Sequence, residues 1–248
     1  MSISVIINTY NSAKTLRPCL ESVKSFDEVI LCDMHSTDET LAIAEEYKCT
    51  VIMHEPVGYV EPARNYAISH ASHSWVLIVD SDEMISDSLR NYLYEYIRKE
   101  NAADGLALAT MNFFMGKFMH GYYPDYHFRL FKKDSIYWPP TIHAVPQIKG
   151  RTEKAPAKKE FSIDHRMQGT TVSNFVSKMN KYTDIELERR QMEQYGQLKM
   201  LFKCFYRFIR MYLLKGGFRD GKAGLCYAIL NSFYKFITIA KIWEIKEK

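Results

Sequence analysis

The first hundred residues alternate between short apolar segments and segments whose apolar residues recur at helical spacing. Four segments, 2–7, 28–32, 50–54 and 75–79, are apolar on both faces, which is typical of buried strands. Three segments with helical spacing, 15–25, 40–47 and 62–69, lie between them. Strands without a polar face must be covered on both sides, so the alternation predicts an α/β fold with a mostly parallel sheet between two layers of helices.

Polar and acidic residues follow three of these strands directly. Residues 8–11 (Asn-Thr-Tyr-Asn) end the first strand, Asp33 ends the second, and residues 80–83 (Asp-Ser-Asp-Glu) end the fourth. Ligands of open α/β sheets bind outside the carboxyl ends of the strands. The convergence of three strand ends therefore predicts a ligand site at that edge of the sheet.

Residues 80–83 point most directly to a reaction. The two carboxylates of an Asp-x-Asp segment after a buried strand can face one cation, and hard oxygen ligands suit Mg²⁺ or Mn²⁺. Such a cation would stabilise the charge left on a nucleoside diphosphate when a sugar is transferred away from it. Helix capping is the alternative, because Asp and Ser are favoured there. The position after the 75–79 strand favours the metal interpretation.

Four blocks taken together, 4–11, 29–40, 63–65 and 79–83, resemble the family-2 inverting glycosyltransferases. The resemblance implies a GT-A fold, which is a Rossmann-like, mostly parallel sheet flanked by helices. The later segments 123–131 and 215–221, together with His143 and His165, resemble the branch that adds hexoses to lipopolysaccharide or lipooligosaccharide cores. The expected reaction is the transfer of a hexose, such as glucose, from a UDP-sugar to a lipid-linked glycan.

The resemblance also implies roles for individual residues. Asp33 would accept a hydrogen bond from the base, Arg64 would lie near the diphosphate, and Asp82 would coordinate the metal, with His165 as a further candidate ligand. The residues implied in nucleotide-sugar binding are Thr9, Tyr10, Asn11, Asp33, Arg64, Asp80 and Ser81. Packing of Tyr10 on the sheet, capping by Asp33 and a structural His165 are the alternatives.

Two departures from the family pattern bear on which nucleotide the donor carries and on which residue is the general base. Met34 and His35 stand where relatives often have a second acid and a glycine, which bears on which nucleotide base is bound. Residues 143–144 read His-Ala where relatives of the branch often have His-Glu. An inverting transfer needs a general base for the acceptor hydroxyl. Asp125 is the candidate, and a turn aspartate after Pro124 is the alternative.

The C-terminal region carries a basic helical stripe. Lys199, Lys203, Arg207 and Arg210 fall on one face of a predicted helix, and the rest of its circumference is apolar. Basic amphipathic helices with aromatic residues bind anionic membrane surfaces. A helical hairpin packed on the core, with its basic residues in solvent, is the alternative. We expect a GT-A domain over 1–170 and a helical appendage over 171–248.

The remaining features limit where the protein works. Five cysteines without zinc or disulfide spacing indicate a reducing cytoplasm. No basic leader precedes the first strand, and no stretch of membrane-spanning length is free of charge. We therefore expect a peripheral protein on the inner face of the cytoplasmic membrane, with no nucleic-acid partner. A nucleotidyltransferase, which would be expected to have a glycine-rich loop, and a non-catalytic membrane binder are the alternatives.

Overall fold

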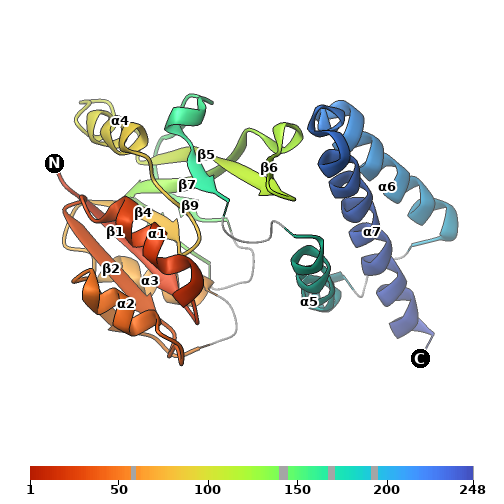
Figure 1. The fold of residues 1–248 in the computed structure, drawn as a ribbon, viewed down its shortest axis with the longest axis horizontal. Helices are drawn as coiled ribbons and strands as arrows, with labels where there is room; N and C mark the ends of the chain where they lie inside the picture. Colours follow the sequence, from red (N-terminus) through yellow and green to blue (C-terminus); the bar gives the residue numbers. More distant parts are fainter. Residues whose placement is uncertain (57–59, 140–144, 167–170, 191–194, 248) are drawn as a thin grey trace. The chain divides into compact units, whose positions relative to one another are not determined.

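A computed structural model describes residues 1–56, 60–139, 145–166, 171–190 and 195–247 (Figure 1). The chain divides into two compact units. The first unit comprises residues 1–111 and 124–168, and the second comprises residues 112–123 and 169–248. The domain boundary predicted at residue 170 stays a prediction.

A mostly parallel sheet forms the centre of the first unit. Its parallel strands lie in the order β4-β1-β2-β3, and β7 then pairs antiparallel with β4 and continues the sheet to β5 and β10. The strands on this path are β1 (Ile3–Thr9), β2 (Glu28–Asp33), β3 (Thr50–Met53), β4 (Trp75–Asp80), β5 (Gly105–Phe114), β7 (Asp125–Lys132) and β10 (Thr152–Lys154). The predicted α/β class, with a mostly parallel sheet flanked by helices, is confirmed.

Shorter strands complete the sheet region. Two of them, β6 (Lys117–Phe118) and β11 (Ile163–His165), pair with β5, while β8 (Ile136–Tyr137) and β9 (Gln147–Ile148) form a separate antiparallel pair. The four strands predicted in the first hundred residues are all present, with ends within two residues of their predicted positions.

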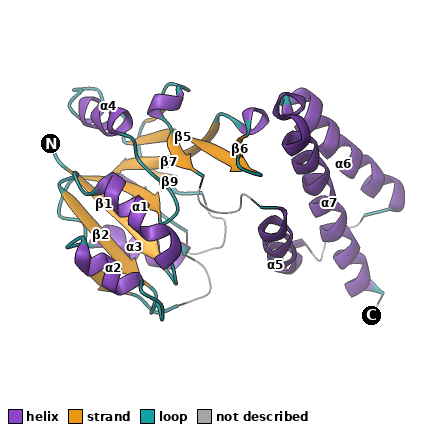
Figure 2. Cartoon of the chain, viewed as in Figure 1, coloured by secondary structure: helices purple, strands orange, loops and turns teal. Residues whose placement is uncertain are grey.

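Helices cover both faces of the sheet (Figure 2). Alternate residues of β1 enter different cores, because Val5 packs in the cluster that contains α1, α2 and α4, whereas Ile6 packs in the cluster that contains α3. The helices are α1 (Ala13–Val23), α2 (Thr40–Glu46), α3 (Glu61–Ser69) and α4 (Asp87–Ile97). Each fully buried aliphatic side chain stabilises the fold by about 1.5–3 kcal/mol, which explains why these strands lack a polar face.

The second unit is largely helical. It contains the helices α5 (Val172–Arg190), α6 (Gln197–Ile209) and α7 (Gly221–Lys246), the π-helical turn η4 (Arg210–Leu214), and the 3₁₀ turns η1 (His120–Tyr122) and η5 (Gly217–Asp220). Two small apolar clusters hold it together. One joins α6 and α7 through Met200 and Ile239, and the other joins Phe114 and Met119 to Ala223 on α7.

The distribution of apolar side chains on α6 is the reverse of that on a helix in a soluble hairpin, whose apolar side faces its partner. Its apolar side chains are outside, with Leu198 83% exposed and Phe202 68% exposed. Within its basic stripe, Arg207 Nη2 donates to Asn231 Oδ1 of α7 at 3.3 Å and Lys203 is half-buried, whereas Lys199 and Arg210 are exposed. Membrane contact by α6 stays a prediction, as does the alternative of a packed hairpin with its basic residues in solvent.

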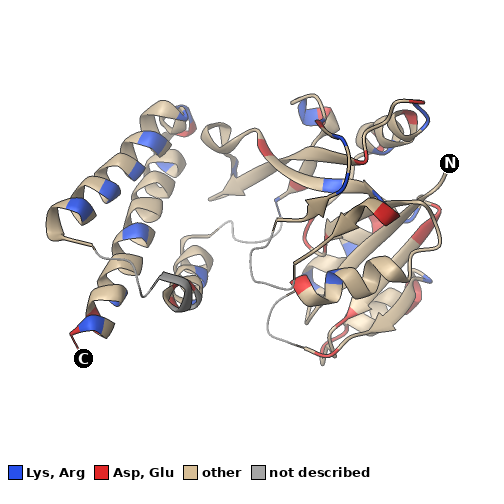
Figure 3. Cartoon of the chain, turned by 180° about the vertical axis from the view of Figure 1, so that it is seen from behind, with Lys and Arg blue, Asp and Glu red and all other residues tan. Residues whose placement is uncertain are grey.

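The charge of this hairpin is strongly biased. Figure 3 shows Lys and Arg spread along α6 and α7. Between residues 195 and 243 the sequence has one acidic residue, Asp220, which is buried. The basic residues in the same span are Lys199, Lys203, Arg207, Arg210, Lys215, Arg219, Lys222, Lys235 and Lys241. Within the described ranges, Gly217–Lys246 is one helical segment long and apolar enough to cross a membrane, by length and composition alone.

Candidate functional site

The carboxyl ends of β1, β2 and β4 lie side by side. Thr9 is paired in register with Asp33, and Asn8 with Asp80, because the three strands are parallel neighbours. The residues predicted from the sequence for nucleotide binding therefore gather at one edge of the sheet, as expected for ligand sites in this class of fold.

Asp33 anchors the turn that follows β2. Its Oδ1 accepts hydrogen bonds from Thr9 Oγ1 at 2.7 Å and Ser36 Oγ at 2.6 Å, and its Oδ2 accepts one from Ser36 N at 2.7 Å. Both Asp33 and Thr9 are buried. A carboxylate offers about four lone-pair sites, so Oδ2 still has capacity for one more donor. Ser36, which the sequence reasoning did not single out, completes this turn.

Asn11 ties the loop after β1 to the same turn. Its backbone N–H donates to Ser36 Oγ at 2.8 Å, and its Oδ1 accepts from Thr37 N at 2.8 Å. Neighbouring Tyr10 is 56% exposed, so its ring is not packed into the sheet edge. His35 has a φ of 57°. A left-handed backbone favours glycine, the residue that the resemblance led us to expect at this position.

A buried arginine holds residues 80–83 together. Arg129 Nη2 donates to Glu83 Oε1 at 2.6 Å and to Asp80 Oδ2 at 3.0 Å. The turn is closed in both directions: Asp80 N donates to Glu83 Oε2 at 2.9 Å, and Glu83 N donates to Asp80 O at 2.9 Å. Asp80 and Glu83 therefore neutralise Arg129, and these three residues form a clamp. Of the three acids in residues 80–83, Asp82 alone lies outside the clamp.

Burial and charge act against each other within the clamp. Burial by itself would raise the pKa of Asp80, but the Arg129 and Arg64 guanidiniums outweigh it and hold that pKa well below its usual range. Burial raises the pKa of Glu83 to about 7, because Arg129 offsets the loss of hydration only in part. Asp80 is thus the carboxylate that stays ionised at neutral pH.

An irregularity in β-pairing places Arg129 in this position. Leu106 of β5 pairs with Leu130 of β7, but the next residue, Ala107, pairs with Phe128, so Arg129 is skipped. Such bulges redirect a side chain and are frequent beside functional sites. Residue type made Arg129 a candidate for neutralising the diphosphate, but sequence periodicity alone does not reveal a bulge, so its contacts with Asp80 and Glu83 could not be predicted.

Arg64 approaches Asp80 from the other side. Its Nη2 donates to Asp80 Oδ1 at 3.3 Å, and its guanidinium carbon lies 4.2 Å from the centre of the Trp138 ring. Asn65 holds Trp138 through two bonds, from its Nδ2 to Trp138 O at 2.6 Å and from Trp138 N to its Oδ1 at 2.9 Å. The contacts of Trp138 with Arg64 and Asn65 were not predicted from the sequence.

Both arginines have a spare buried donor. Neither Arg64 Nε nor Arg129 Nε has a hydrogen-bond partner among the residues that the structure describes. A buried N–H without a partner costs free energy, about 1–3 kcal/mol. Two such guanidinium donors at the strand ends fit a ligand with anionic oxygens.

Asp82 and His165, which were predicted separately as metal ligands, lie together. Asp82 Oδ2 and His165 Nε2 are 3.1 Å apart, and both side chains are largely buried. An antiparallel bridge between Met84 and Asp164 positions β11 beside residues 80–83. Burial acts to lower the pKa of His165, but the hydrogen bond with Asp82 and the other nearby acids outweigh it, so this pKa is raised. The pair is therefore in a negative potential that attracts a cation.

This pair fits a metal ion whose coordination shell is completed by the substrate. Within the described ranges, no group of three or more His, Cys, Asp or Glu side chains could hold a metal by itself. Mg²⁺ commonly binds through one or two carboxylates together with waters and substrate phosphates. One carboxylate and one imidazole are consistent with such an incomplete shell rather than with a closed protein cage.

Asp125 is the first residue of β7. It is paired in register with Thr110 of β5, and its Oδ2 lies 3.3 Å from His127 Nε2. The side chain is partly exposed, so solvent or a ligand can reach the carboxylate. His143 and Ala144 lie outside the described residues.

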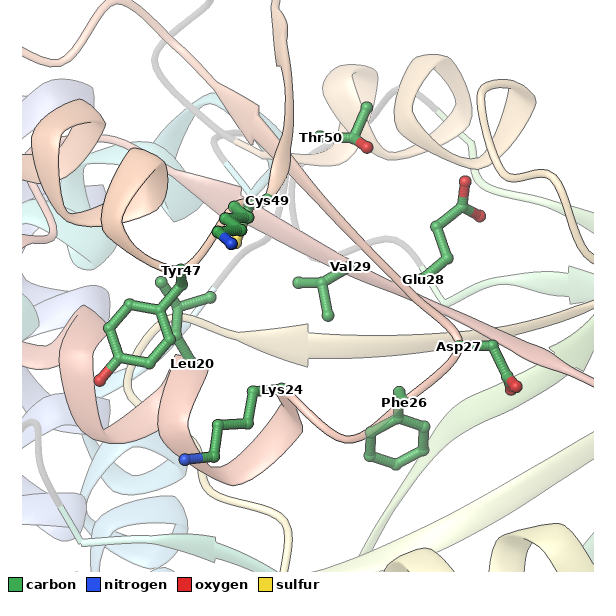
Figure 4. A pocket seen from close by; sticks show the side chains of 10 residues that line it. Leu20, Lys24, Phe26, Asp27, Glu28, Val29, Tyr47, Cys49 and Thr50 are labelled. Atoms are coloured by element: carbon green, nitrogen blue, oxygen red, sulfur yellow. The ribbon is translucent and has the colours of Figure 1, made fainter.

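A hollow at the opposite edge of the sheet is separate from this site (Figure 4). Its lining includes Glu28 and Thr50, the first residues of β2 and β3, together with Leu20, Tyr47 and Cys49. It therefore lies at the amino ends of the strands. None of the residues predicted for nucleotide or metal binding lines it.

Comparisons with known proteins agree with this geometry. The family model described as "Glycosyl transferase family 2" matches residues 4–148. The lipopolysaccharide core biosynthesis glycosyltransferase LpsC of Rhizobium meliloti is 23% identical, over 98% of this chain and 93% of LpsC. An uncharacterized glycosyltransferase of Rickettsia bellii is 24% identical, over 98% of this chain and 86% of the relative.

A solved structure, S. aureus TarS 1–349 in complex with UDP-GlcNAc, is also similar. It is 19% identical, with a TM-score of 0.44 over 96% of this chain and 81% of TarS 1–349.

Proposed function

The chain belongs to glycosyltransferase family 2, and from this membership we propose that it transfers a hexose from a UDP-sugar to a lipid-linked glycan, with inversion. The observation that carries the proposal is the pair of buried arginines at the carboxyl edge, each with an Nε that has no partner among the described residues. The diphosphate of a nucleotide sugar has the anionic oxygens that such donors bind.

The donor would lie along the strand ends. Arg64 and Arg129 would bind or orient the diphosphate, while Asp80 keeps both guanidiniums in place. The remaining capacity of Asp33 Oδ2 would accept the N3–H of uracil. Tyr10 and Asn11, in the loop after β1, would form the wall beside the base, and Ser81 would contact the donor from the opposite loop.

Asp82 and His165 would hold Mn²⁺ or Mg²⁺ against the diphosphate. When bound, the ion would stabilise the negative charge of the UDP leaving group. The protein's own contribution here is to keep two ligands at a fixed separation, because β11 is bridged to the strand end through Met84 and Asp164.

Asp125 would act as the general base. A carboxylate that takes the proton from an acceptor hydroxyl must be within hydrogen-bond reach of it, and the partial exposure of Asp125 supports this role. The hydroxyl oxygen would then attack the anomeric carbon from the side opposite the diphosphate, forming the new glycosidic bond as the bond to UDP breaks.

The name of LpsC supports an acceptor in the lipopolysaccharide core or a related envelope glycan. Such an acceptor is attached to a membrane, and the exposed apolar side of α6 beside a basic stripe supports contact with an anionic membrane surface. On this proposal the enzyme works as a peripheral protein at the cytoplasmic face.

A donor panel tests the proposal. The protein is incubated with Mn²⁺ and with UDP-, GDP- and dTDP-sugars in turn, and nucleotide release and thermal protection are measured. We expect a response to at least one UDP-sugar that is lost in Asp82→Asn and kept in Glu95→Gln, an exposed acid on α4. No response to any donor would refute the proposed reaction, and a response to GDP-sugars alone would refute the choice of uridine.

A further inference from the structure

Glycine residues allow the backbones of the turns η1 and η5 of the second unit to approach each other closely. A Cβ added to Gly121 would lie 2.8 Å from the Gly217 Cα, and one added to Gly224 would lie 1.9 Å from the Gly217 carbonyl oxygen. Since no larger residue fits, the backbones are in direct contact. This junction brings together two sequence segments, 120–123 and 217–224. The proposed function does not explain why they are in contact.

A buried carboxylate sits at the centre of the junction. The Asp220 side chain is inaccessible, and its oxygens accept from His120 N at 3.0 Å, Gly121 N at 3.0 Å and His120 Nδ1 at 2.8 Å. An ionised carboxylate can only accept. The proton of the neutral imidazole is therefore on Nδ1, and the lone pair of Nε2 is available to a ligand.

The oriented imidazole lies in an aromatic setting. The His120 side chain is 44% exposed, and its ring centre is 4.8 Å from that of Phe118. Phe118 in turn contacts Tyr123 at 5.5 Å. Binding sites for small polar molecules are built in this way, from apolar and aromatic surface with a few fixed polar groups that set orientation. One fixed acceptor beside aromatic rings suits a sugar hydroxyl.

We propose that His120 is an acceptor-binding residue: its Nε2 accepts a hydrogen bond from a hydroxyl of the glycan acceptor, and Asp220 is the positioning residue that sets its tautomer. This inference rests on the proposed function and adds an acceptor subsite to it. Two backbone N–H bonds and the glycine contacts already join the turns. The imidazole makes a further bond to the same carboxylate, and because the His120 side chain is 44% exposed it can also meet a ligand.

Two substitutions separate ligand binding from a structural latch. The amide nitrogen of Asn, a donor, stands at the same number of bonds from Cα as His Nδ1, and the amide oxygen of Gln, an acceptor, stands at the same number of bonds as His Nε2. His120→Asn therefore keeps a donor for Asp220 and loses the group that faces the acceptor, while His120→Gln does the reverse. Transfer from UDP-glucose to membranes of a strain lacking this gene is measured against UDP release without membranes.

We expect the ratio of transfer to acceptor-free UDP release to fall about tenfold in His120→Asn, and to stay within about threefold of wild type in His120→Gln. Any other ranking overturns the inference, and the reverse ranking identifies His120 as a latch only. Absence of UDP release with any UDP-sugar in the wild type is the separate failure of the proposed function.

Nitrogen NMR of His120 provides a readout that does not depend on the reaction. In the wild-type protein the neutral ring should carry its proton on Nδ1. In Asp220→Asn, an amide facing Nδ1 can donate to it, so the proton should move to Nε2 in part of the population. A wild-type ring with its proton on Nε2 would overturn the assignment of Nε2 as an acceptor.

Discussion

The carboxyl edge of the first unit and the α6–α7 hairpin of the second differ in where their charged and apolar side chains lie. At the edge, Arg129 is buried against two carboxylates and the surrounding apolar residues are inside. In the hairpin, α6 turns Leu198 and Phe202 outward while Arg207 lies at the seam. At the edge, the buried polar atoms without a partner among the described residues are Arg64 Nε, Arg129 Nε and the side-chain amide atoms of Asn8. The hairpin leaves a whole apolar helix side for something else to cover.

The difference shows how each region depends on its surroundings. Buried charges at the edge are stable only while all partners are present, because an uncompensated buried charge costs several kcal/mol. The apolar side of α6 contributes nothing to folding while it is exposed, and its burial in another phase would contribute about 25 cal/mol per Å². Substitutions should therefore affect folding in one region and association in the other.

The largest effect is expected from breaking the clamp. Arg129→Met leaves the buried Glu83 without a counter-charge and leaves Asp80 with Arg64 as its remaining guanidinium partner, so we expect the free energy of unfolding to fall by about 3–5 kcal/mol. Urea unfolding measures this change. Addition of Glu83→Gln to Arg129→Met should recover part of the loss, and a single-variant loss below about 1 kcal/mol would show that the clamp is not as described.

Metal-dependent donor binding should change next most strongly. Asp82→Asn removes the carboxylate beside His165 while the clamp around Asp80 stays intact. We expect the affinity for UDP-sugar in the presence of Mn²⁺ to fall at least tenfold, about 1.4 kcal/mol or more, with the unfolding midpoint nearly unchanged. Calorimetric titration with and without EDTA provides the measurement, and equal affinity with Mn²⁺ in variant and wild type would exclude Asp82 as a ligand.

The hairpin should respond in association rather than in folding. Leu201→Gln combined with Phe205→Gln removes two exposed apolar side chains of α6. We expect binding to phosphatidylglycerol vesicles to weaken about tenfold or more, with a change in unfolding free energy within about 0.5 kcal/mol. Sedimentation with vesicles measures the first quantity.

A buried leucine is the matched control for this experiment. Leu93→Gln on α4 places an amide in the core of the first unit, so it should destabilise the fold and leave vesicle binding of the folded protein unchanged. If the α6 variant loses stability as Leu93→Gln does, the two regions do not differ in the way described.

The smallest effect is expected at the start of α4. Ser86 Oγ accepts from Leu89 N at 3.1 Å and caps this helix. Ser86→Ala should lower the free energy of unfolding by about 1 kcal/mol, without altering donor or vesicle binding. Thermal unfolding measures the change, and an effect on UDP-sugar affinity would mean that α4 is coupled to the edge of the sheet.

Much of the first unit could be predicted because its pattern is local. Strands such as 75–79 reveal their burial through continuous apolar residues, and Asp33 and Asp80 mark where strands end. Asp82 and His165 were both selected as metal ligands from residue type and resemblance, and they lie 3.1 Å apart. Their roles in binding remain proposals.

The contacts of Arg129, Glu83 and Trp138 could not be predicted in the same way. Arg129 reaches Asp80 and Glu83 because of a bulge in β7, and a bulge depends on the partner strand rather than on the residue itself. Trp138 is held beside Arg64 through its bonds with Asn65, which is 73 positions away in the chain. His120 and Asp220 likewise meet across 100 positions.

The sequence by itself determined the order of strands and helices, the edge at which polar groups converge, and the basic stripe of residues 199–210, because hydrophobic periodicity and strand-end residues are local properties of the chain. Only the tertiary structure decided which acids Arg129 contacts, which acid of residues 80–83 lies outside that contact, and which side of α6 points outward. Those outcomes depend on pairing between distant segments, where burial sets the cost of each unpaired charge.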